Sequence, residues 1–217
     1  MCGRYTIYTK AEALLERFHA QMQEGTYSPR YNAAPSQALP VILNTDSSHI
    51  VPAQWGFLPS WAKDKDIRPL INARAETAAT KPMFRHAMKS NRCLVLADGF
   101  YEWKKTEAGK IPYRITLTSE EPFAFAGIWS VLETAEKSLL TFAILTTTPN
   151  DLMKDIHNRM PIILPAAAEA TWLDPTRDAG DVEDLLQPYS AAVMTAYPVS
   201  KRVNIPSIDV PELITPI

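Results

Sequence analysis

The sequence predicts an α+β fold, a single compact domain over residues 1–217 with peripheral helices around a mainly antiparallel β-sheet. Short apolar runs of strand length recur along the chain, and turn-like sequence separates them. Strands and helices do not alternate regularly, which argues against a parallel sheet. A length of 217 residues allows one sizeable core and does not require a second domain. The clearest predicted strands are residues 93–97, 112–117, 123–129 and 140–147.

The N-terminal part is expected to carry one helix followed by a loop. Thr9 is a suitable N-cap and Gly25 a suitable end, and the apolar face between them consists of Leu14, Phe18 and Met22. Residues 27–37 contain two prolines and are expected to form an ordered loop.

A hairpin and a long functional loop are predicted next. Residues 39–44 and 50–55 have strand character, and the polar turn at 45–48 joins them. Residues 56–80 are rich in Trp, Pro, Lys and Arg and have no clean period, which is typical of a functional loop. The remaining predicted elements are helices at residues 149–156, 166–173 and 181–186 and strands at residues 160–164 and 193–198.

The composition is that of a globular protein with a polarised charge. Hydrophobic residues make up 46% and charged residues 21%, which excludes a disordered or fibrous chain. No stretch approaches the roughly 20 apolar residues of a membrane span, and no secretory signal is recognisable, so we expect a cytoplasmic protein. The net charge is −2, but residues 60–92 carry eight basic side chains against three acidic ones. Residues 165–190 carry six acidic side chains against one basic. Such polarity can bind phosphates on one side, or it can reflect two solvated faces.

The two cysteines have different expected roles, since their separation fits neither a metal site nor a disulfide framework. Cys93 lies in an apolar run and is predicted to be a small buried hydrophobe. Cys2 becomes the N-terminal residue once Met1 is removed and then carries an amine beside a thiol. Model α-amines titrate near about 7.7–8.0, so such an amine is partly neutral and nucleophilic. A 1,2-aminothiol can trap an aldehyde as an imine and then as a thiazolidine ring. In the same tetrapeptide, Arg4 could hold a phosphate.

Three further segments carry residues suited to chemistry. Asn72 and Arg74 are two residues apart, which on an extended segment points both side chains to one side. Glu102 lies between aromatic residues, where partial desolvation would raise its pKa and suit it to acid-base work. His157 follows a short predicted helix. The alternatives are a turn-forming Asn72, a salt-bridged Glu102 and a buried, hydrogen-bonded His157.

These segments together closely resemble the SOS response-associated peptidase (SRAP) family. The resemblance rests on residues 1–4, 70–77, 97–104 and 155–161, and residues 30–35 and 211–214 extend it through nearly the whole chain. It implies an SRAP-like fold. It also implies that Met1 is removed, in part by the protein's own activity. Mature Cys2 then crosslinks to the ring-opened aldehyde of an abasic site in single-stranded DNA.

The resemblance also implies a role for each site residue. Cys2 would be the nucleophile, Asn72 would orient its amine, and Glu102 and His157 would move protons. Arg4 and Arg74 match positions that bind phosphates flanking the lesion. Pro82 stands where the family pattern has a further basic residue, for which Lys81 or Arg85 could substitute. The weaker assignments near the DNA are Thr146, Trp103 and Pro35.

The partner implied is single-stranded DNA containing abasic sites, and we expect the cytoplasmic protein to associate with the nucleoid during DNA damage. We expect no cofactor, metal or membrane partner, a monomer, and little sequence preference. Three other functions stay open. Class II glutamine amidotransferases also begin Met-Cys-Gly, although their Asn-Gly-x-Ile-x-Asn segment is lacking here. Cys2 and His157 could instead form the dyad of a cysteine peptidase. A non-covalent DNA-binding module would need the basic region but not Cys2.

Overall fold

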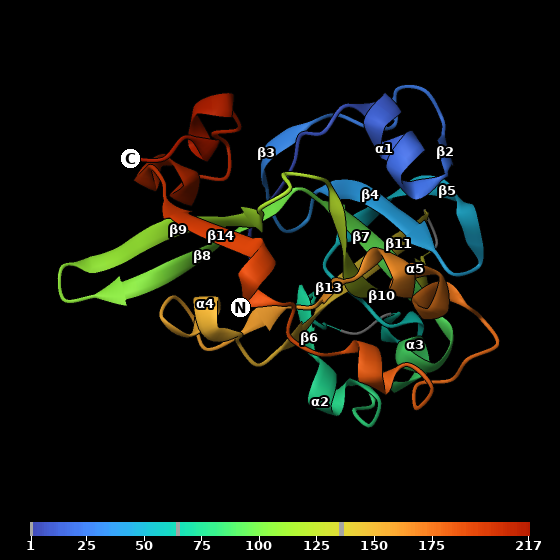
Figure 1. The fold of residues 1–217 in the computed structure, drawn as a ribbon. Coiled ribbons are helices and arrows are strands. Elements are labelled where there is room, and N and C mark those ends of the chain that lie inside the picture. Colours follow the sequence, from blue (N-terminus) through green and yellow to red (C-terminus); the bar gives the residue numbers. More distant parts are fainter. Residues whose placement is uncertain (1, 64–65, 135–136) are drawn as a thin grey trace.

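Five strands close into a ring at the centre of the molecule (Figure 1). The computed structural model describes residues 2–63, 66–134 and 137–217. Neighbours pair antiparallel around the ring, except that β5 meets β11 in parallel through Gln54 and Thr141. That parallel contact closes the ring. Its strands are β4 (Ala38–Leu43), β5 (Asp46–Trp55), β7 (Arg92–Ala97), β10 (Phe123–Glu133) and β11 (Ser138–Thr147).

Short strands extend the same sheet at its margins. β6 pairs in parallel with β11, just beyond the residues of β11 that contact β5. The neighbouring β12 pairs antiparallel with β11, so that Thr146 is opposite both Arg74 and Pro161. Two segments far apart in the sequence therefore flank one stretch of β11. The marginal strands are β2 (Gln21–Met22), β6 (Asn72–Arg74), β12 (Met160–Pro161) and β13 (Ile163–Leu164).

A second, fully antiparallel sheet has the order β14-β9-β8-β1-β3. The C-terminal segment, red in Figure 1, lies beside β3 and the β8–β9 hairpin. This sheet therefore joins both ends of the chain. Its strands are β1 (Tyr5–Ile7), β3 (Arg30–Ala33), β8 (Gly99–Thr106), β9 (Gly109–Leu117) and β14 (Met194–Pro198).

Short helices surround the two sheets, which confirms the predicted α+β domain on mainly antiparallel sheet. The α-helices are α1 (Ala11–Phe18), α2 (Ala75–Ala78), α3 (Arg85–Ser90), α4 (Asp151–Lys154) and α5 (Ala166–Leu173). The 3-10 helices are η1 (Ser60–Ala62), η2 (Glu183–Leu185), η3 (Ala191–Val193), η4 (Lys201–Asn204) and η5 (Pro211–Ile214).

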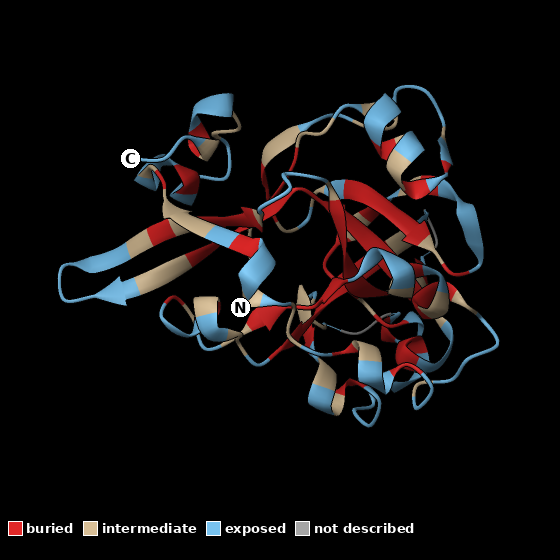
Figure 2. Ribbon diagram, in the orientation of Figure 1, coloured by how far each residue is buried: buried red, intermediate tan, exposed pale blue. Residues whose placement is uncertain are grey.

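The core fills the ring and the space between the sheets, where buried residues concentrate in Figure 2. Trp55 and Phe142 stack there with ring centroids 6.3 Å apart. Cys93 is a buried core residue, as predicted. A Cβ atom on Gly127 would come within 2.8 Å of the Cys93 sulfur, so the close packing of β10 on β7 requires glycine at this position. The tip of the β8–β9 hairpin, in contrast, is exposed.

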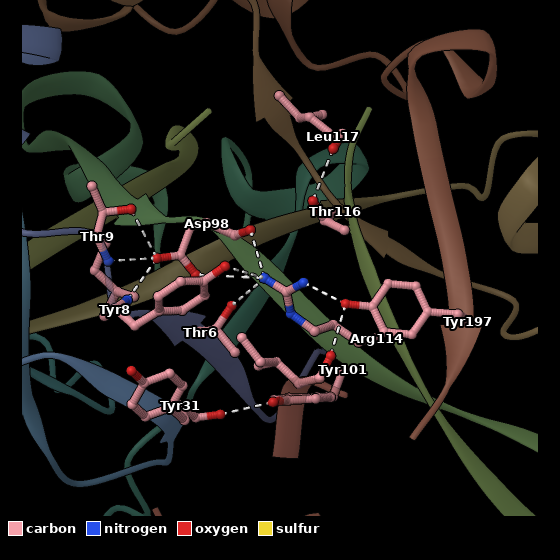
Figure 3. Close-up of polar contacts among 12 residues, drawn as sticks. Thr6, Tyr8, Thr9, Tyr31, Asp98, Tyr101, Arg114, Thr116, Leu117 and Tyr197 are labelled. Carbon is pink, nitrogen blue, oxygen red and sulfur yellow. Dashed lines mark hydrogen bonds and ion pairs between the residues drawn. The ribbon is translucent and has the colours of Figure 1, made fainter. Parts of the chain in front are cut away.

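A buried charge network fixes the end of β1 (Figure 3). The Asp98 carboxylate accepts hydrogen bonds from the backbone nitrogens of Tyr8 and Thr9, at 2.6 and 3.0 Å. Arg114 lies 3.8 Å from the other Asp98 oxygen and donates to the Tyr197 hydroxyl at 2.6 Å. Because breaking a buried ion pair typically costs about 3–5 kcal/mol, this network holds the N-terminal strand firmly on β8 and β9.

Two predictions for the N-terminal part were wrong. The first helix ends at Phe18 rather than near Gly25, because His19 adopts a left-handed conformation with φ of 49°. Met22 therefore lies in β2, where it pairs with β5. The predicted loop at residues 27–37 contains β3, which forms the edge of the second sheet.

Further along the chain, most predicted strands are confirmed and several elements differ. The structure adds β8 and α3, which the sequence interpretation missed. The predicted strand at residues 160–164 is split into β12 and β13. The predicted helix at residues 181–186 is the shorter 3-10 helix η2, and that at residues 149–156 shortens to α4. Within residues 56–80 the described chain forms η1, β6 and α2 rather than an uninterrupted loop.

Candidate functional site

The second sheet places Cys2 beside Glu102. The Arg4 carbonyl accepts a hydrogen bond of 3.0 Å from the Tyr101 nitrogen, which continues the β1–β8 ladder toward the N-terminus. Continuing this antiparallel register places Gly3 opposite Glu102 and Cys2 opposite Trp103. Cys2 lies close enough to Glu102 for the carboxylate charge to act on its thiol. Cys2 is 0% exposed and Glu102 is 2% exposed. A thiol and a carboxyl group are therefore buried side by side.

The first sheet contributes Asn72 to the same place. Its Nδ2 donates a hydrogen bond of 2.7 Å to the Cys2 carbonyl oxygen. Asn72 is the first residue of β6, and the alternation along this strand buries Ala73 and leaves Arg74 exposed. Among the described residues, the buried Asn72 Oδ1 has no hydrogen-bond partner. Because buried acceptors are normally satisfied, such an atom is a candidate for binding a substrate or an amine.

His157 completes the cluster from a third segment. It follows α4, whose first turn is capped by Asn150 through a 2.9 Å hydrogen bond from the Met153 nitrogen. The His157 Nδ1 lies 3.8 Å from Glu102 Oε1, and the ring is partly exposed. The four residues predicted to carry chemistry, Cys2, Asn72, Glu102 and His157, are thus gathered between the two sheets.

Burial controls the protonation of this cluster. Desolvation raises the pKa of the Glu102 carboxyl group above its ordinary value. Desolvation, and then the negative charge of Glu102, raise the pKa of the Cys2 thiol. Cys2 is therefore a protonated thiol at neutral pH, and Glu102 retains its proton to a higher pH than an exposed glutamate. A carboxyl group with a raised pKa is suited to donating and accepting protons in acid-base catalysis.

The two predicted phosphate-binding arginines have different surroundings. Arg74 is exposed at the start of α2. Arg4 is half-buried, and its Nη1 donates to Asn32 Oδ1 at 2.9 Å and to the Val203 carbonyl at 2.7 Å. Burial lowers the pKa of Arg4 below its ordinary value. Arg4 thus also joins the N-terminal segment to the C-terminal one.

The remaining predicted contacts lie around the cluster. Thr146 is fully buried, and its hydroxyl lies 3.4 Å from the Ala73 carbonyl. Trp103 is partly exposed and donates from Nε1 to Asn204 Oδ1 at 2.7 Å. Pro35 is partly exposed in the β3–β4 connection. Trp103 thus borders the cluster directly, whereas Thr146 lies on β11, opposite Arg74 of the neighbouring strand β6.

An ion pair beside His157 was missed by the sequence interpretation. Arg159 binds both carboxylate oxygens of Glu76, with Nη2 2.9 Å from Oε2. The same guanidinium donates to the Thr146 carbonyl. The hydrogen bonds from Arg159 to the Glu76 carboxylate lower the pKa of Glu76. No spacing rule connects residues so far apart in sequence, and only the pairing of β6 and β12 with one strand brings them together.

The described part of the chain has neither a membrane-spanning helix nor a cluster of metal ligands. No helix there is both long enough and apolar enough to cross a bilayer. Within the same residues, His, Cys, Asp and Glu side chains form no group of three or more that could bind a metal ion.

The fold and the cluster together define a class of protein in which a cysteine near the N-terminus is held between two sheets by an asparagine and lies near a buried glutamate. The model of the SOS response associated peptidase (SRAP) family matches residues 1–206. The chain belongs to this family.

Known relatives and solved structures resemble most or all of the chain. Abasic site processing protein YoqW of Bacillus subtilis is 47% identical, over 99% of both chains. Abasic site processing protein YedK of Escherichia coli is 31% identical, over 100% of both. Abasic site processing protein HMCES of Gallus gallus is 34% identical, over 90% of this chain and 68% of that protein. A crystal structure of a protein from Bacteroides thetaiotaomicron superposes with a TM-score of 0.91 at 28% identity, over all of both chains.

Proposed function

We propose that this protein processes abasic sites in DNA, and that it captures them covalently through Cys2 after Met1 has been removed. The names of its relatives support the first part. The observation that carries the second part is the 2.7 Å hydrogen bond from Asn72 to the Cys2 carbonyl, beside the buried Glu102. That arrangement holds a residue-2 cysteine next to an acid-base group.

The covalent step is condensation of a 1,2-aminothiol with an aldehyde. The Cys2 amine attacks the aldehyde carbon of the ring-opened deoxyribose, and the resulting carbinolamine loses water to give an imine. The sulfur then adds to the imine carbon, and the thiol proton ends on the nitrogen. One C–N bond and one C–S bond form, and one water molecule leaves. The product is a thiazolidine that joins the protein to the DNA.

Glu102 and His157 are suited to carrying the protons of this sequence. Ring opening and loss of water need an acid, and attack by the thiol needs a base, since burial keeps Cys2 protonated. Glu102 can fill both roles because its protonated form is an acid and its ionised form a base, and burial raises its pKa above the ordinary value. The Asn72 Oδ1, which has no hydrogen-bond partner among the residues that the structure describes, can accept a hydrogen bond from the Cys2 amine or from the carbinolamine hydroxyl.

The DNA would bind as a flexible single strand to a monomer, with Arg74 on a flanking phosphate and Trp103 as a stacking surface. A single strand can bring its sugar to a buried site without the cost of unpairing bases. Arginine and aromatic side chains are the usual means of holding such strands. Arg4 would contribute to the same phosphate path and Pro35 to the apolar surface. Thr146 is fully buried on β11, so it would support Arg74 on the neighbouring strand rather than touch the DNA. No cofactor is needed for this chemistry.

Removal of Met1 by the protein itself is part of the proposal. It needs one hydrolysis of the bond before Cys2, not a general peptidase. A cysteine peptidase acting on other proteins requires a thiolate, whereas burial raises the pKa of Cys2. The raised pKa of the Cys2 thiol favours condensation with an aldehyde over a thiolate–imidazolium dyad.

A denaturing gel tests the proposal. Single-stranded DNA containing uracil is treated with uracil glycosylase to create an abasic site and is then incubated with the protein. We expect a slowly migrating covalent band, which is absent when the DNA keeps its uracil. Retention of the DNA on a native gel without any covalent band would instead support a non-covalent binding module.

A further inference from the structure

Asn204, in the C-terminal segment, contacts two of the residues proposed to hold DNA. Its Oδ1 accepts a 2.7 Å hydrogen bond from the Trp103 indole Nε1. Its backbone carbonyl oxygen accepts a 3.4 Å hydrogen bond from Arg4 Nη2. Because an indole N–H only donates and only the oxygen of an amide side chain accepts, the Trp103 contact also fixes which way the Asn204 amide faces. One residue therefore touches both the proposed stacking surface and a proposed phosphate contact.

The backbone at Asn204 is held by its neighbours on both sides. Val203, the preceding residue, is fully buried in a second, smaller hydrophobic cluster. After Asn204, the carbonyl oxygens of Ile205 and Ile208 accept hydrogen bonds of 3.1 and 2.7 Å from Nδ2 of the buried Asn32. Asn204 itself is exposed. Its side chain is thus a surface group on a backbone that other residues fix, so its replacement should leave the segment folded.

The Trp103 ring lies where β8 passes from its buried half to the exposed hairpin tip. A partly exposed ring is held less firmly by packing than a buried one, so a hydrogen bond at Nε1 contributes more to its orientation. A base stacks on an aromatic ring only when the face of the ring is turned toward it. Holding the ring in that orientation before DNA arrives reduces the conformational cost of binding.

We infer that Asn204 is a positioning residue for DNA binding, which holds the Trp103 ring in the orientation that stacks on a base beside the abasic site. The inference rests on the proposed function and deepens it, because it assigns how the stacking surface is set. The carbonyl of the same residue keeps Arg4 next to that surface. A base and a phosphate of neighbouring nucleotides are thereby held by one unit.

A direct contact between Asn204 and the DNA is the competing role. The indole occupies Oδ1, and Nδ2 then carries two donors that oxygen atoms of the DNA can accept. Trp103→Phe distinguishes the two roles, because it keeps an aromatic ring for stacking and removes the indole N–H. In a positioning role, Asn204→Ala has little left to change in a Trp103→Phe background. In a direct role, it weakens DNA binding equally in both backgrounds.

The test uses single-stranded DNA with a tetrahydrofuran analogue in place of the abasic sugar, which has no aldehyde and cannot crosslink. Fluorescence anisotropy gives its dissociation constant. Asn204→Ala should weaken binding roughly fivefold, at the low end of the cost of losing one base–aromatic stack. When the nucleotides beside the analogue are also replaced by tetrahydrofuran spacers, which keep the phosphates and lack the bases, the loss should be less than about twofold. In the Trp103→Phe background it should also stay below about twofold, since coupled residues are non-additive.

The rate of capture at saturating abasic DNA should be unchanged in Asn204→Ala, because the substitution alters binding and leaves the reacting groups in place. Equal weakening for the two DNAs, an equal effect in the two backgrounds, or unchanged binding of the DNA that carries its bases overturns the inference.

A matched control is available in Asn44, whose Oδ1 also accepts a hydrogen bond from an indole, that of Trp129, at 3.0 Å. Asn44→Ala should leave the affinity for both DNAs unchanged. A readout without DNA keeps the inference separate from the proposed function. In ¹H–¹⁵N spectra, the indole N–H signal of Trp103 should shift and exchange faster with water in Asn204→Ala, and should stay in place in Asn44→Ala. An unmoved Trp103 signal in Asn204→Ala would overturn the inference, whereas a parent that binds the analogue but forms no crosslink with a true abasic site would overturn only the proposed covalent capture.

Discussion

The Asn72 side chain donates a 2.7 Å hydrogen bond to the Cys2 carbonyl, and this contact joins the two sheets at the candidate site. Cys2 precedes the first strand of the second sheet, whereas Asn72 begins a marginal strand of the first. The contact therefore depends on the packing of the whole domain rather than on a local motif. It fixes the backbone of the residue whose amine and thiol the proposed reaction uses.

Asn72→Ala should slow capture roughly 10- to 100-fold at saturating DNA. An unsatisfied buried carbonyl costs about 1–3 kcal/mol, and each 1.4 kcal/mol or so is tenfold in rate. Single-turnover kinetics on abasic single-stranded DNA measure this effect. Asn44→Ala is a matched control, because Asn44 also donates to a backbone carbonyl, that of Ser90, at 2.9 Å. That control should lower thermal stability without slowing capture, and equal slowing in both variants would contradict the assignment of Asn72.

Glu102→Gln should abolish most capture activity and yet stabilise the protein at neutral pH. Burial raises the pKa of Glu102, so the folded state holds this proton to a higher pH than the unfolded chain does. The contribution of Glu102 to the free energy of unfolding is thus full below about pH 4.5 and is lost as the pH rises through the raised pKa. Glutamine does not titrate. The variant should melt near the parent at pH 4 and above it at pH 8.

Thermal denaturation across pH, with capture kinetics on the same samples, checks this prediction. Glu107→Gln at the exposed β8–β9 turn is the control and should change neither quantity. A Glu102→Gln variant that melts below the parent at pH 8 would mean that the ionised carboxylate is stabilised by its surroundings. A variant that captures abasic DNA at the parent rate would remove Glu102 from the proton-transfer step.

The sequence was sufficient for the fold class and for most strands because runs such as residues 93–97 and 140–147 are largely apolar, and all of their residues except Leu140 are buried. The sequence was insufficient where tertiary contacts determine the secondary structure of a segment. Met22 continues the apolar face of the first helix, yet pairing with β5 makes it a strand residue. The first half of β8 is buried, but it includes the charged Glu102, and the second half carries Lys104 and Lys105 toward the exposed hairpin tip, so this strand has no continuous apolar run.

The candidate site was predictable as a set of residues but not as a geometry. Cys2, Asn72, Glu102 and His157 stood out by residue type and by family resemblance, and the structure gathers them. The partners of Arg4 and Arg159 could not be predicted, because each contacts a residue far away in the sequence. Such pairs depend on how strands align, and alignment is set by the whole core.

Arg74→Ala should weaken DNA binding in a salt-dependent way and leave the reaction itself intact. Removing one phosphate contact to single-stranded DNA reduces the steepness of log K against log salt by about 0.7. The rate at saturating DNA should then return nearly to that of the parent. Arg4→Ala should add a loss of thermal stability, because Asn32 and the Val203 carbonyl lose their donor. Lys110→Ala at the hairpin is the control for charge alone, and an Arg74→Ala salt slope equal to the parent's would exclude the phosphate contact.

The N-terminus provides the most direct test, because three chemistries depend on it differently. Thiazolidine formation needs both the amine and the thiol of Cys2, so any residue left before Cys2 should abolish capture by converting the amine to an amide. Cys2→Ala keeps the amine and should give only an imine, which is lost on heating unless borohydride reduces it. The parent adduct should survive denaturation without reduction.

Other nucleophiles make opposite predictions for the same variants. A thiol acting alone would still crosslink with a blocked N-terminus, and a lysine imine would be indifferent to both changes. Mass spectrometry of the digested product decides among them, since Cys93 is buried and serves as an internal control for thiol reactivity. The expected adduct lies on a peptide that begins at Cys2 and lacks Met1, with a mass equal to peptide plus abasic DNA fragment minus one water. An adduct on Cys93 or on a lysine would rule out capture by the N-terminal aminothiol.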